Sequence, residues 1–284
     1  MAIIDDARDL AVDVGDDRIQ SRGARAWAAP LRVAGTVFRR TVAIAVLLVA
    51  WEVLPRAGVV DRVFLPPFSE VIDKWWEMLR DGDILAHTEA SMKRTGSGFA
   101  LAVAIALPLG LVIGWFPLVA EILNPLLELF RNTAPLALLP VFVLILGLGE
   151  SSKIGIVTYA CVWPILLNTI SGVRNVDPLL IKSARSMGLS SPRLFQKVIL
   201  PAAVPTVFTG IRLAGAFAIV VLIAAELVGA KAGLGYLINY AQSNFAIQEM
   251  YAGIITISMI GVGINQLLLA VERRLSRWRA TPDS

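Results

Sequence analysis

The chain of 284 residues contains one cysteine, Cys161, and one histidine, His87. A single cysteine excludes an intrachain disulfide. A single histidine lacks the partner ligands that a zinc site needs, and the H-E-x-x-H motif of metalloproteases is absent. Cys161 lies within an apolar run, where a small packing residue is expected. No metal site is therefore expected in this chain.

The sequence also lacks the G-x-x-x-x-G-K-[S/T] loop, with which P-loop proteins bind nucleotide phosphates. No cofactor is therefore expected in this chain, and an ATP-driven process must use a nucleotide site on another chain. The net charge is +4, but basic residues do not cluster with aromatic ones as in single-strand binding proteins. We therefore expect no nucleic-acid partner.

Apolar residues are abundant: 56% of the chain is hydrophobic and the mean hydropathy is +0.70. A helix needs about 20 apolar residues to cross ~30 Å of hydrocarbon, and in lipid it satisfies its own backbone hydrogen bonds. The pattern predicts an all-α polytopic membrane protein with about six transmembrane helices. The expected spans are approximately Val37–Leu54, Gly96–Phe116, Pro125–Leu148, Ile154–Val173, Val204–Val228 and Tyr251–Val271.

These spans divide the chain into three parts. Residues 1–36 are expected to be a cytoplasmic, disordered extension, residues 37–275 the transmembrane domain, and residues 276–284 a cytoplasmic tail. In the first outer loop, a short interfacial helix is expected to follow Ser69, and Ser69 is expected to cap its N-terminus. Small residues at helix-packing spacing, such as Gly110 and Gly114, predict close helix approach.

The distribution of lysine and arginine predicts the orientation of the chain in the membrane. Sixteen of these residues fall on the side that contains both termini, and eight fall on the other side. Cytoplasmic loops carry the excess of basic residues. Both termini are therefore expected in the cytoplasm.

The loop between the fourth and fifth expected spans, residues 175–201, has the signals of two short helices. Asp177–Pro178 is a typical helix start, and Gly188 is a typical helix end. Ser191–Pro192 begins the second helix, which Leu200–Pro201 is expected to end. A rigid polar hairpin of this kind is suited to dock into a groove on a cytoplasmic partner.

This loop resembles the EAA loop of ABC importer permeases. Ala184, Gly188 and Ile199–Pro201 follow its spacing, although Lys182 and Ser183 replace the glutamate and first alanine of the pattern. The resemblance implies the type I ABC importer permease fold and a coupling loop that contacts a separate ATPase subunit, which binds the ATP. The residues expected to make this contact are Lys182, Ser183, Ala184, Arg185, Met187, Gly188, Leu200 and Pro201.

Further stretches are similar to the nitrate/aliphatic sulfonate/taurine branch of this family, and with the loop they cover about residues 60–275. They are Leu65–Pro67, Thr133–Pro140, Gly147–Lys153, Ala225–Glu226 and Gly233–Ile238. The resemblance implies a bacterial inner-membrane homodimer, an extracytoplasmic solute-binding protein, and transport of a small oxyanion. Aliphatic sulfonates, taurine, nitrate and bicarbonate are the implied substrates, and some relatives carry pyrimidine-type vitamin precursors.

Ionisable side chains at membrane depth are costly, so each one is a functional candidate. Pairing between helices or extension of the side chain to the membrane interface is the alternative explanation, favoured for Arg212, Glu121 and Glu128. Polar residues of the middle spans are candidates to face a translocation pathway. The candidate pathway residues are Arg131, Asn132, Thr133, Asn168, Thr169 and Glu226.

Two other classes of protein remain as alternatives. A secondary transporter driven by an ion gradient should show inverted repeats and several deep charges, but no convincing internal repeat is found. An intramembrane enzyme needs metal ligands or a nucleophile–base pair, for which one histidine and one cysteine are a poor basis. The main hypothesis is therefore a transport subunit and not an enzyme.

Overall fold

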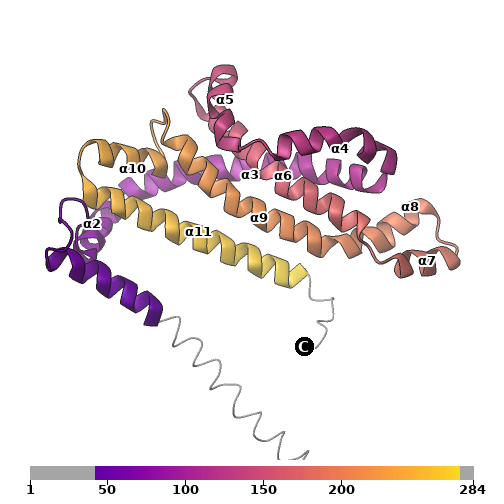
Figure 1. Cartoon of the computed structure of the whole chain (residues 1–284), viewed down its shortest axis with the longest axis horizontal. Coiled ribbons are helices and arrows are strands. Elements are labelled where there is room, and N and C mark those ends of the chain that lie inside the picture. Colours follow the sequence, from indigo (N-terminus) through magenta and orange to yellow (C-terminus); the bar gives the residue numbers. More distant parts are fainter. Residues whose placement is uncertain (1–41, 276–284) are drawn as a thin grey trace, which may run out of the picture. The chain divides into compact units, whose positions relative to one another are not determined.

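The computed structural model describes residues 42–275, and all regular secondary structure in that range is helical (Figure 1). The expected extension 1–36 and tail 276–284 lie outside the described residues. After a helix that covers residues 42–56, the elements are α2 Phe68–Asp81, α3 Asp83–Trp115, α4 Pro117–Arg131, η1 Pro135–Leu138, α5 Leu139–Leu146, α6 Glu150–Arg174, α7 Pro178–Ser186, α8 Ser191–Leu194, η2 Phe195–Ile199, α9 Leu200–Glu226, α10 Leu234–Ser243 and α11 Ile247–Leu275.

The chain divides into two units, residues 1–69 and residues 70–284. In the first unit, residues 42–56 are helical. The Glu52 carboxylate accepts hydrogen bonds from the hydroxyl and the backbone N–H of Ser69, both at 2.9 Å. The expectation that Ser69 caps the following helix was wrong, because α2 already begins at Phe68 and the Ser69 hydroxyl is bonded to Glu52.

The core of the second unit is formed by α3, α6 and α9, which run alongside one another in Figure 1. Gly110 of α3 lies so close to α6 that an added Cβ would be 2.6 Å from the Cβ of Thr169, and Gly114 faces Val173 at 2.8 Å. Gly210 of α9 approaches α6 in the same way. The predicted close packing through small residues is confirmed.

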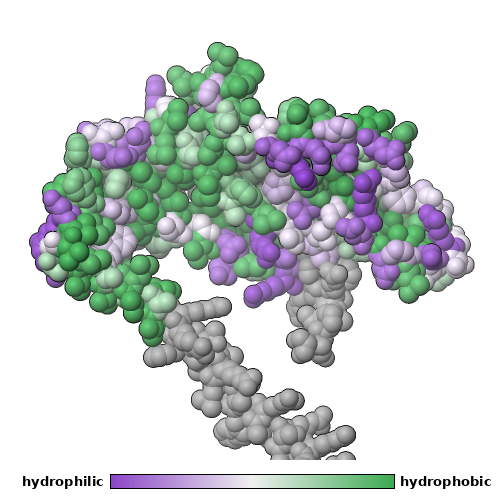
Figure 2. Space-filling view, viewed as in Figure 1, coloured by the Kyte–Doolittle hydropathy of each residue, from purple (hydrophilic) through white to green (hydrophobic). Residues whose placement is uncertain are grey.

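Four described helices are long and apolar enough to cross a membrane, and a bent pair forms a fifth candidate span. The third expected span is this bent pair: α4 and the η1–α5 segment meet at 83°. Pro135 is the reason, because the residue before a proline is pushed out of the helical region, and Ala134 is extended. Large apolar side chains such as Leu144 and Ile145 are exposed on α5, and Figure 2 shows this hydrophobic surface.

The second span is longer than expected, because α3 begins at Asp83 and not near Gly96. The first turns of α3 carry polar side chains such as Ser91 and Arg94, which form hydrogen bonds inside the molecule. These side chains are therefore compatible with a helix and do not require a solvent-exposed loop. Arg94 and Lys153, counted above as basic residues of outer loops, are only 4% and 3% exposed. They are therefore not loop charges, and six basic residues remain on that side.

The hairpin of residues 175–201 has the expected first half. The Asp177 carboxylate accepts from the Leu179 N–H at 2.8 Å and caps α7. Gly188 has φ +78°, and the bonds from Gly188 N–H to Arg185 and from Leu189 N–H to Ala184 end the helix as in a Schellman motif.

The second half of the hairpin differs from the expectation, because α8 passes without a stop through the π-helical turn η2 into α9. Pro201 does not end the short helix. A proline lacks the N–H and crowds the preceding turn of an α-helix, and the wider π turn just before it relieves this conflict.

Candidate functional site

The hairpin α7–α8 lies at one end of the long helices, with α10 at the other end (Figure 1). Five of the expected coupling residues are exposed there: Lys182, Ser183, Arg185, Met187 and Gly188. The other three lie deeper, since Ala184 is buried beneath the hairpin and Leu200 and Pro201 are half-buried at the start of α9.

Apolar side chains are also exposed on this hairpin. Met187 is 74% exposed and Leu179 is 69% exposed, and Leu180 lies half in solvent between them. Leu180, Ala184 and Met187 have helical spacing along the hairpin, but of the three only Ala184 is buried. The hairpin therefore exposes the apolar side chains of Leu179, Leu180 and Met187 together with the polar side chains of Lys182, Ser183 and Arg185.

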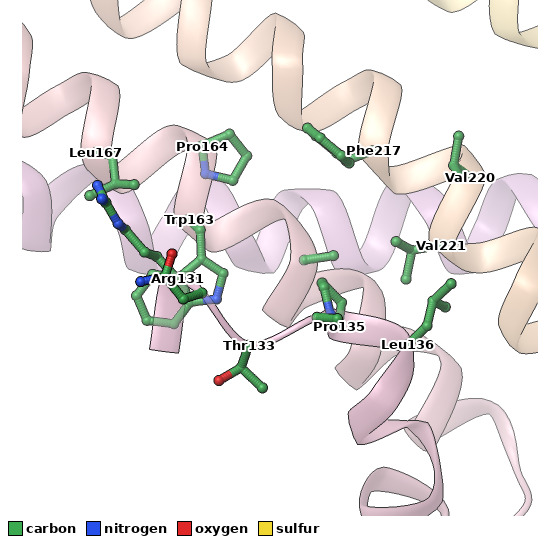
Figure 3. Close-up of a pocket in the computed structure, with 13 residues that line it drawn as sticks. Arg131, Thr133, Pro135, Leu136, Trp163, Pro164, Leu167, Phe217, Val220 and Val221 are labelled. Carbon is green, nitrogen blue, oxygen red and sulfur yellow. The ribbon is translucent and has the colours of Figure 1, made fainter. Parts of the chain in front are cut away.

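A second feature is a cavity of about 510 Å³ between the break of the third span, α6 and α9 (Figure 3). Arg131, Asn132 and Thr133 line it, together with Trp163 of α6. The remaining lining residues are mainly apolar: Ala134, Pro135, Leu136, Ala160, Pro164, Leu167, Phe217, Val220 and Val221. The 83° bend thus places three of the candidate pathway residues around one hollow.

The other three candidate pathway residues do not line this cavity. Thr169 is fully buried where α6 meets Gly110, and its hydroxyl donates to Ile165 O at 2.7 Å. Asn168 packs against Gly210 and donates to Pro164 O at 2.8 Å. Both side chains contribute to helix packing. Neither lines the cavity, so the cavity gives no support for a role of either residue in the pathway.

Glu226 lies at the far end of α9, in a buried polar cluster. Its carboxylate accepts from Arg94 Nη1 at 2.6 Å, from the Ser91 hydroxyl, and from the Gly235 N–H at 2.9 Å. Gly233 is tightly packed here, since an added Cβ would be 2.3 Å from Glu226 Oε1. The pairing explanation for a deep charge applies to Glu226, as it does to Arg212, whose Nη1 lies 2.9 Å from Glu272 Oε2 on α11.

Arg94 is the residue of this cluster that the sequence analysis missed. Besides Glu226, its guanidinium binds the Glu150 carboxylate of α6 and the Ala232 carbonyl. The Ser91 hydroxyl donates to Glu226 and accepts from the Leu234 N–H at 2.8 Å. Charge at membrane depth had singled out Glu226, but nothing in the sequence linked it to Arg94, because the members of the site come from four distant segments.

The two polar regions are joined by the same two helices. α6 begins at Glu150, the exposed partner of Arg94, and ends at Arg174 beside the hairpin, and α9 runs back from Leu200 to Glu226. Since α6 and α9 pack tightly along their length, a force on the hairpin acts on a rigid pair. Among residues 42–275 no group of His, Cys, Asp and Glu side chains is arranged to hold a metal ion.

Comparison with known proteins places this geometry in a family. Residues 106–279 match the model of "Binding-protein-dependent transport system inner membrane component". The taurine transport system permease protein TauC of Escherichia coli is 33% identical over 268 residues, 93% of this chain and 96% of that protein. The putative aliphatic sulfonates transport permease protein SsuC of Bacillus subtilis is 33% identical over 83% of this chain and 85% of its own.

A solved structure supports the fold. A chain of the inward-facing MetNI methionine ABC transporter superposes with a TM-score of 0.57 at 18% identity, covering 66% of this chain and 93% of that one. The expected type I ABC importer permease fold is confirmed, and so is the resemblance to the nitrate/sulfonate/taurine branch.

Proposed function

This chain belongs to the family of binding-protein-dependent transport system inner membrane components, and from that premise we propose that it couples solute import to ATP hydrolysis on a separate ATPase subunit. It is a membrane permease subunit of an ABC importer for a small solute. The observation that carries the proposed coupling is the hairpin α7–α8, which presents Met187, Leu179 and Leu180 at the end of α6 and α9.

Large apolar side chains that are exposed together on one short segment indicate an interaction site. The hairpin is held rigid by the Asp177 cap and the Gly188 turn, so a partner that moves it also moves α6 and α9. Docking of the hairpin in a groove of the ATPase is thus the proposed means of transmission. The pathway then opens and closes through a rigid-body motion of these helices, comparable to a domain rotation.

The proposal includes the remaining partners. A second copy of the chain completes the pathway, and an extracytoplasmic solute-binding protein delivers the solute. A small oxyanion is the proposed substrate, supported by relatives named for taurine and for aliphatic sulfonates. Both termini lie on the cytoplasmic side of a bacterial inner membrane, supported by the excess of basic residues on that side.

Substitution of Gly188 by valine tests the coupling. A β-branched residue at φ +78° is strained by about 1–2 kcal/mol, so the hairpin should lose its shape. We expect the importer reconstituted with its ATPase and binding protein to lose solute-stimulated ATP hydrolysis and uptake together.

Gly82 provides the matched control, because it also has positive φ, +89°, and open space around it, but lies at the start of α3. Gly82→Val should carry a similar strain and keep the coupling. Equal stimulation in Gly188→Val and Gly82→Val, at equal amounts of folded protein, would remove the hairpin from the coupling route.

A further inference from the structure

The turn between α10 and α11 holds an aromatic residue in an unusual backbone conformation. Phe245 has φ +56°, and within residues 42–275 it is the one non-glycine residue with positive φ. The bonds from Phe245 N–H to the Gln242 carbonyl and from Ala246 N–H to the Ala241 carbonyl form a Schellman motif, in which glycine usually takes this position. The left-handed conformation is costly for any residue with a Cβ.

Packing within the chain does not explain why a phenylalanine occupies this position. Phe245 is 75% exposed, so burial of its ring in the described part of the chain offsets little of the cost. The hairpin α7–α8 has Gly188 at the same position of its own Schellman motif, and a glycine here would form the same turn without strain. Strain that is kept at an exposed position indicates a function.

The turn lies at the end of the long helices that is opposite the hairpin α7–α8 (Figure 1). α9 has 27 residues and so covers about 40 Å, and α11, a candidate span, begins directly after the turn at Ile247. With the hairpin on the cytoplasmic side, as proposed above, the turn is at the outer surface of the membrane. The family to which the chain belongs is named for its dependence on a binding protein, which is a candidate partner at this surface.

The residues around Phe245 favour a protein rather than lipid as the partner. Gln242, Ser243 and Asn244 are exposed and uncharged, and residues 239–248 contain no lysine or arginine. Segments that lie in a membrane interface combine aromatic with basic residues, whereas aromatic residues among serine and asparagine are typical of surfaces that bind proteins.

α2 provides the contrast at the same end of the molecule. It is joined to the start of α11 by Lys74, whose Nζ lies 3.5 Å from the Glu249 carboxylate. On its exposed face the guanidinium of Arg80 lies over the ring of Trp76 at 5.2 Å. An aromatic and a basic residue together suit contact with lipid head groups, so α2 has the composition that the turn lacks.

We propose that the turn Gln242–Ala246 is a docking site for the extracytoplasmic solute-binding protein, with Phe245 as the side chain that inserts into it. The inference rests on the proposed function, because it gives the binding protein proposed there a contact surface on this chain. Burial of the ring in the complex offsets the cost of the left-handed backbone. The turn holds Phe245 in its docking conformation before the partner arrives, and such preorganisation increases affinity.

Photo-cross-linking from position 245 tests the site directly. The importer carrying Phe245→p-benzoylphenylalanine is reconstituted in lipid nanodiscs with its ATPase and its solute-binding protein, and the adduct is identified by mass spectrometry. We expect an adduct with the solute-binding protein. Met259→p-benzoylphenylalanine, on the exposed face of α11, is the control and should not form it. An adduct of position 245 with lipid or a second copy alone, or no adduct, would overturn the docking site.

Phe245→Gly separates docking from folding, because it keeps the left-handed turn and removes the ring. The temperature of thermal unfolding should not fall, and a fall would show that the ring stabilises the fold and not the complex. The concentration of solute-binding protein that gives half-maximal stimulation of ATP hydrolysis should rise about tenfold or more, as for loss of an aromatic hot spot.

Phe116→Ala is the matched control, because Phe116 is also an exposed phenylalanine, 51% exposed, but follows the last residue of α3. It should leave the half-maximal concentration unchanged. A Phe245→Gly importer that titrates like Phe116→Ala would overturn the proposal. Absence of any stimulation in the native importer would instead refute the proposed coupling, and the cross-link, which needs no ATP turnover, still decides the docking site.

Discussion

The two ends of α9 differ in the surroundings of their side chains. At the Glu226 end, charged groups are buried and paired within the chain: Arg94 is 4% exposed and Glu226 is 1% exposed. At the Leu200 end, the hairpin exposes apolar residues such as Met187 to solvent. A buried charge needs its partner to be in place when the chain folds, whereas exposed apolar side chains such as Met187 are available to a second protein, as proposed above.

This difference indicates a division of roles along one rigid helix. The Arg94–Glu226 cluster fixes the start of α10, the start of α6 and the end of α9 to α3. The hairpin is locally well formed, and in the proposed function its exposed apolar side chains contact the ATPase chain. Changes in the cluster should therefore reduce stability, and changes in the hairpin should reduce coupling.

The largest effect is expected for Arg94→Met. The substitution leaves the Glu226 carboxylate buried without its cation, and breaking one half of a buried pair costs about 3–5 kcal/mol. Thermal unfolding of the purified chain measures the loss. Lys93→Met is the control, because the Lys93 side chain is 74% exposed and its one ion pair within residues 42–275 is with the exposed Glu89.

The double variant Arg94→Met with Glu226→Gln should regain part of the lost stability, because the neutral amide is cheaper to bury than an unpaired carboxylate. An Arg94→Met chain that unfolds at the temperature of Lys93→Met would show that the cluster does not hold this end of the molecule together.

The sequence predicted the hairpin better than the cluster for a physical reason. Asp177 and Gly188 act on the backbone within a few residues, so their effect can be read locally. Arg94 and Glu226 are far apart in the sequence, and nothing local distinguishes Arg94 from its exposed neighbour Lys93.

The broken third span is an intermediate case. Pro135 was visible in the sequence, but prolines are tolerated within membrane helices when neighbouring groups satisfy the backbone. Whether Pro135 bends or breaks the span depends on the tertiary contacts of α4 and α5, which the sequence alone does not provide. The cavity that this break creates could not be predicted for that reason.

A smaller effect is expected for Gly110→Ala in the packed core between the two ends. The new Cβ would lie 2.6 Å from Thr169 and 3.1 Å from the Leu166 carbonyl, so α3 and α6 must separate at a cost of about 1–3 kcal/mol. Gly96→Ala, in the same helix but with nothing within 4 Å, should instead gain about 0.5–1 kcal/mol. Thermal unfolding should move in opposite directions for the two variants, and a shift of the same sign in both would contradict the tight packing of α3 on α6.

The smallest expected effect is that of Asp177→Ala in the hairpin. Loss of the bond from Leu179 N–H should cost α7 about 1 kcal/mol. Hydrogen exchange of the α7 amides should become faster, while the amides of α3 remain unchanged. Asp177→Asn keeps a capping oxygen and should exchange like the native chain. Faster exchange in both variants would point to the charge rather than the cap.

Cross-linking from Met187 tests the central claim most directly. In a Cys161→Ser background, Met187→Cys places one reactive thiol on the exposed turn of the hairpin, and Met259→Cys on the exposed face of α11 is the control. The account predicts that the Met187→Cys thiol forms a cross-link to the ATPase chain in the assembled importer and that the Met259→Cys thiol does not. Labelling of Met187→Cys by a membrane-impermeant maleimide added outside intact cells, with no cross-link to the ATPase, would contradict it.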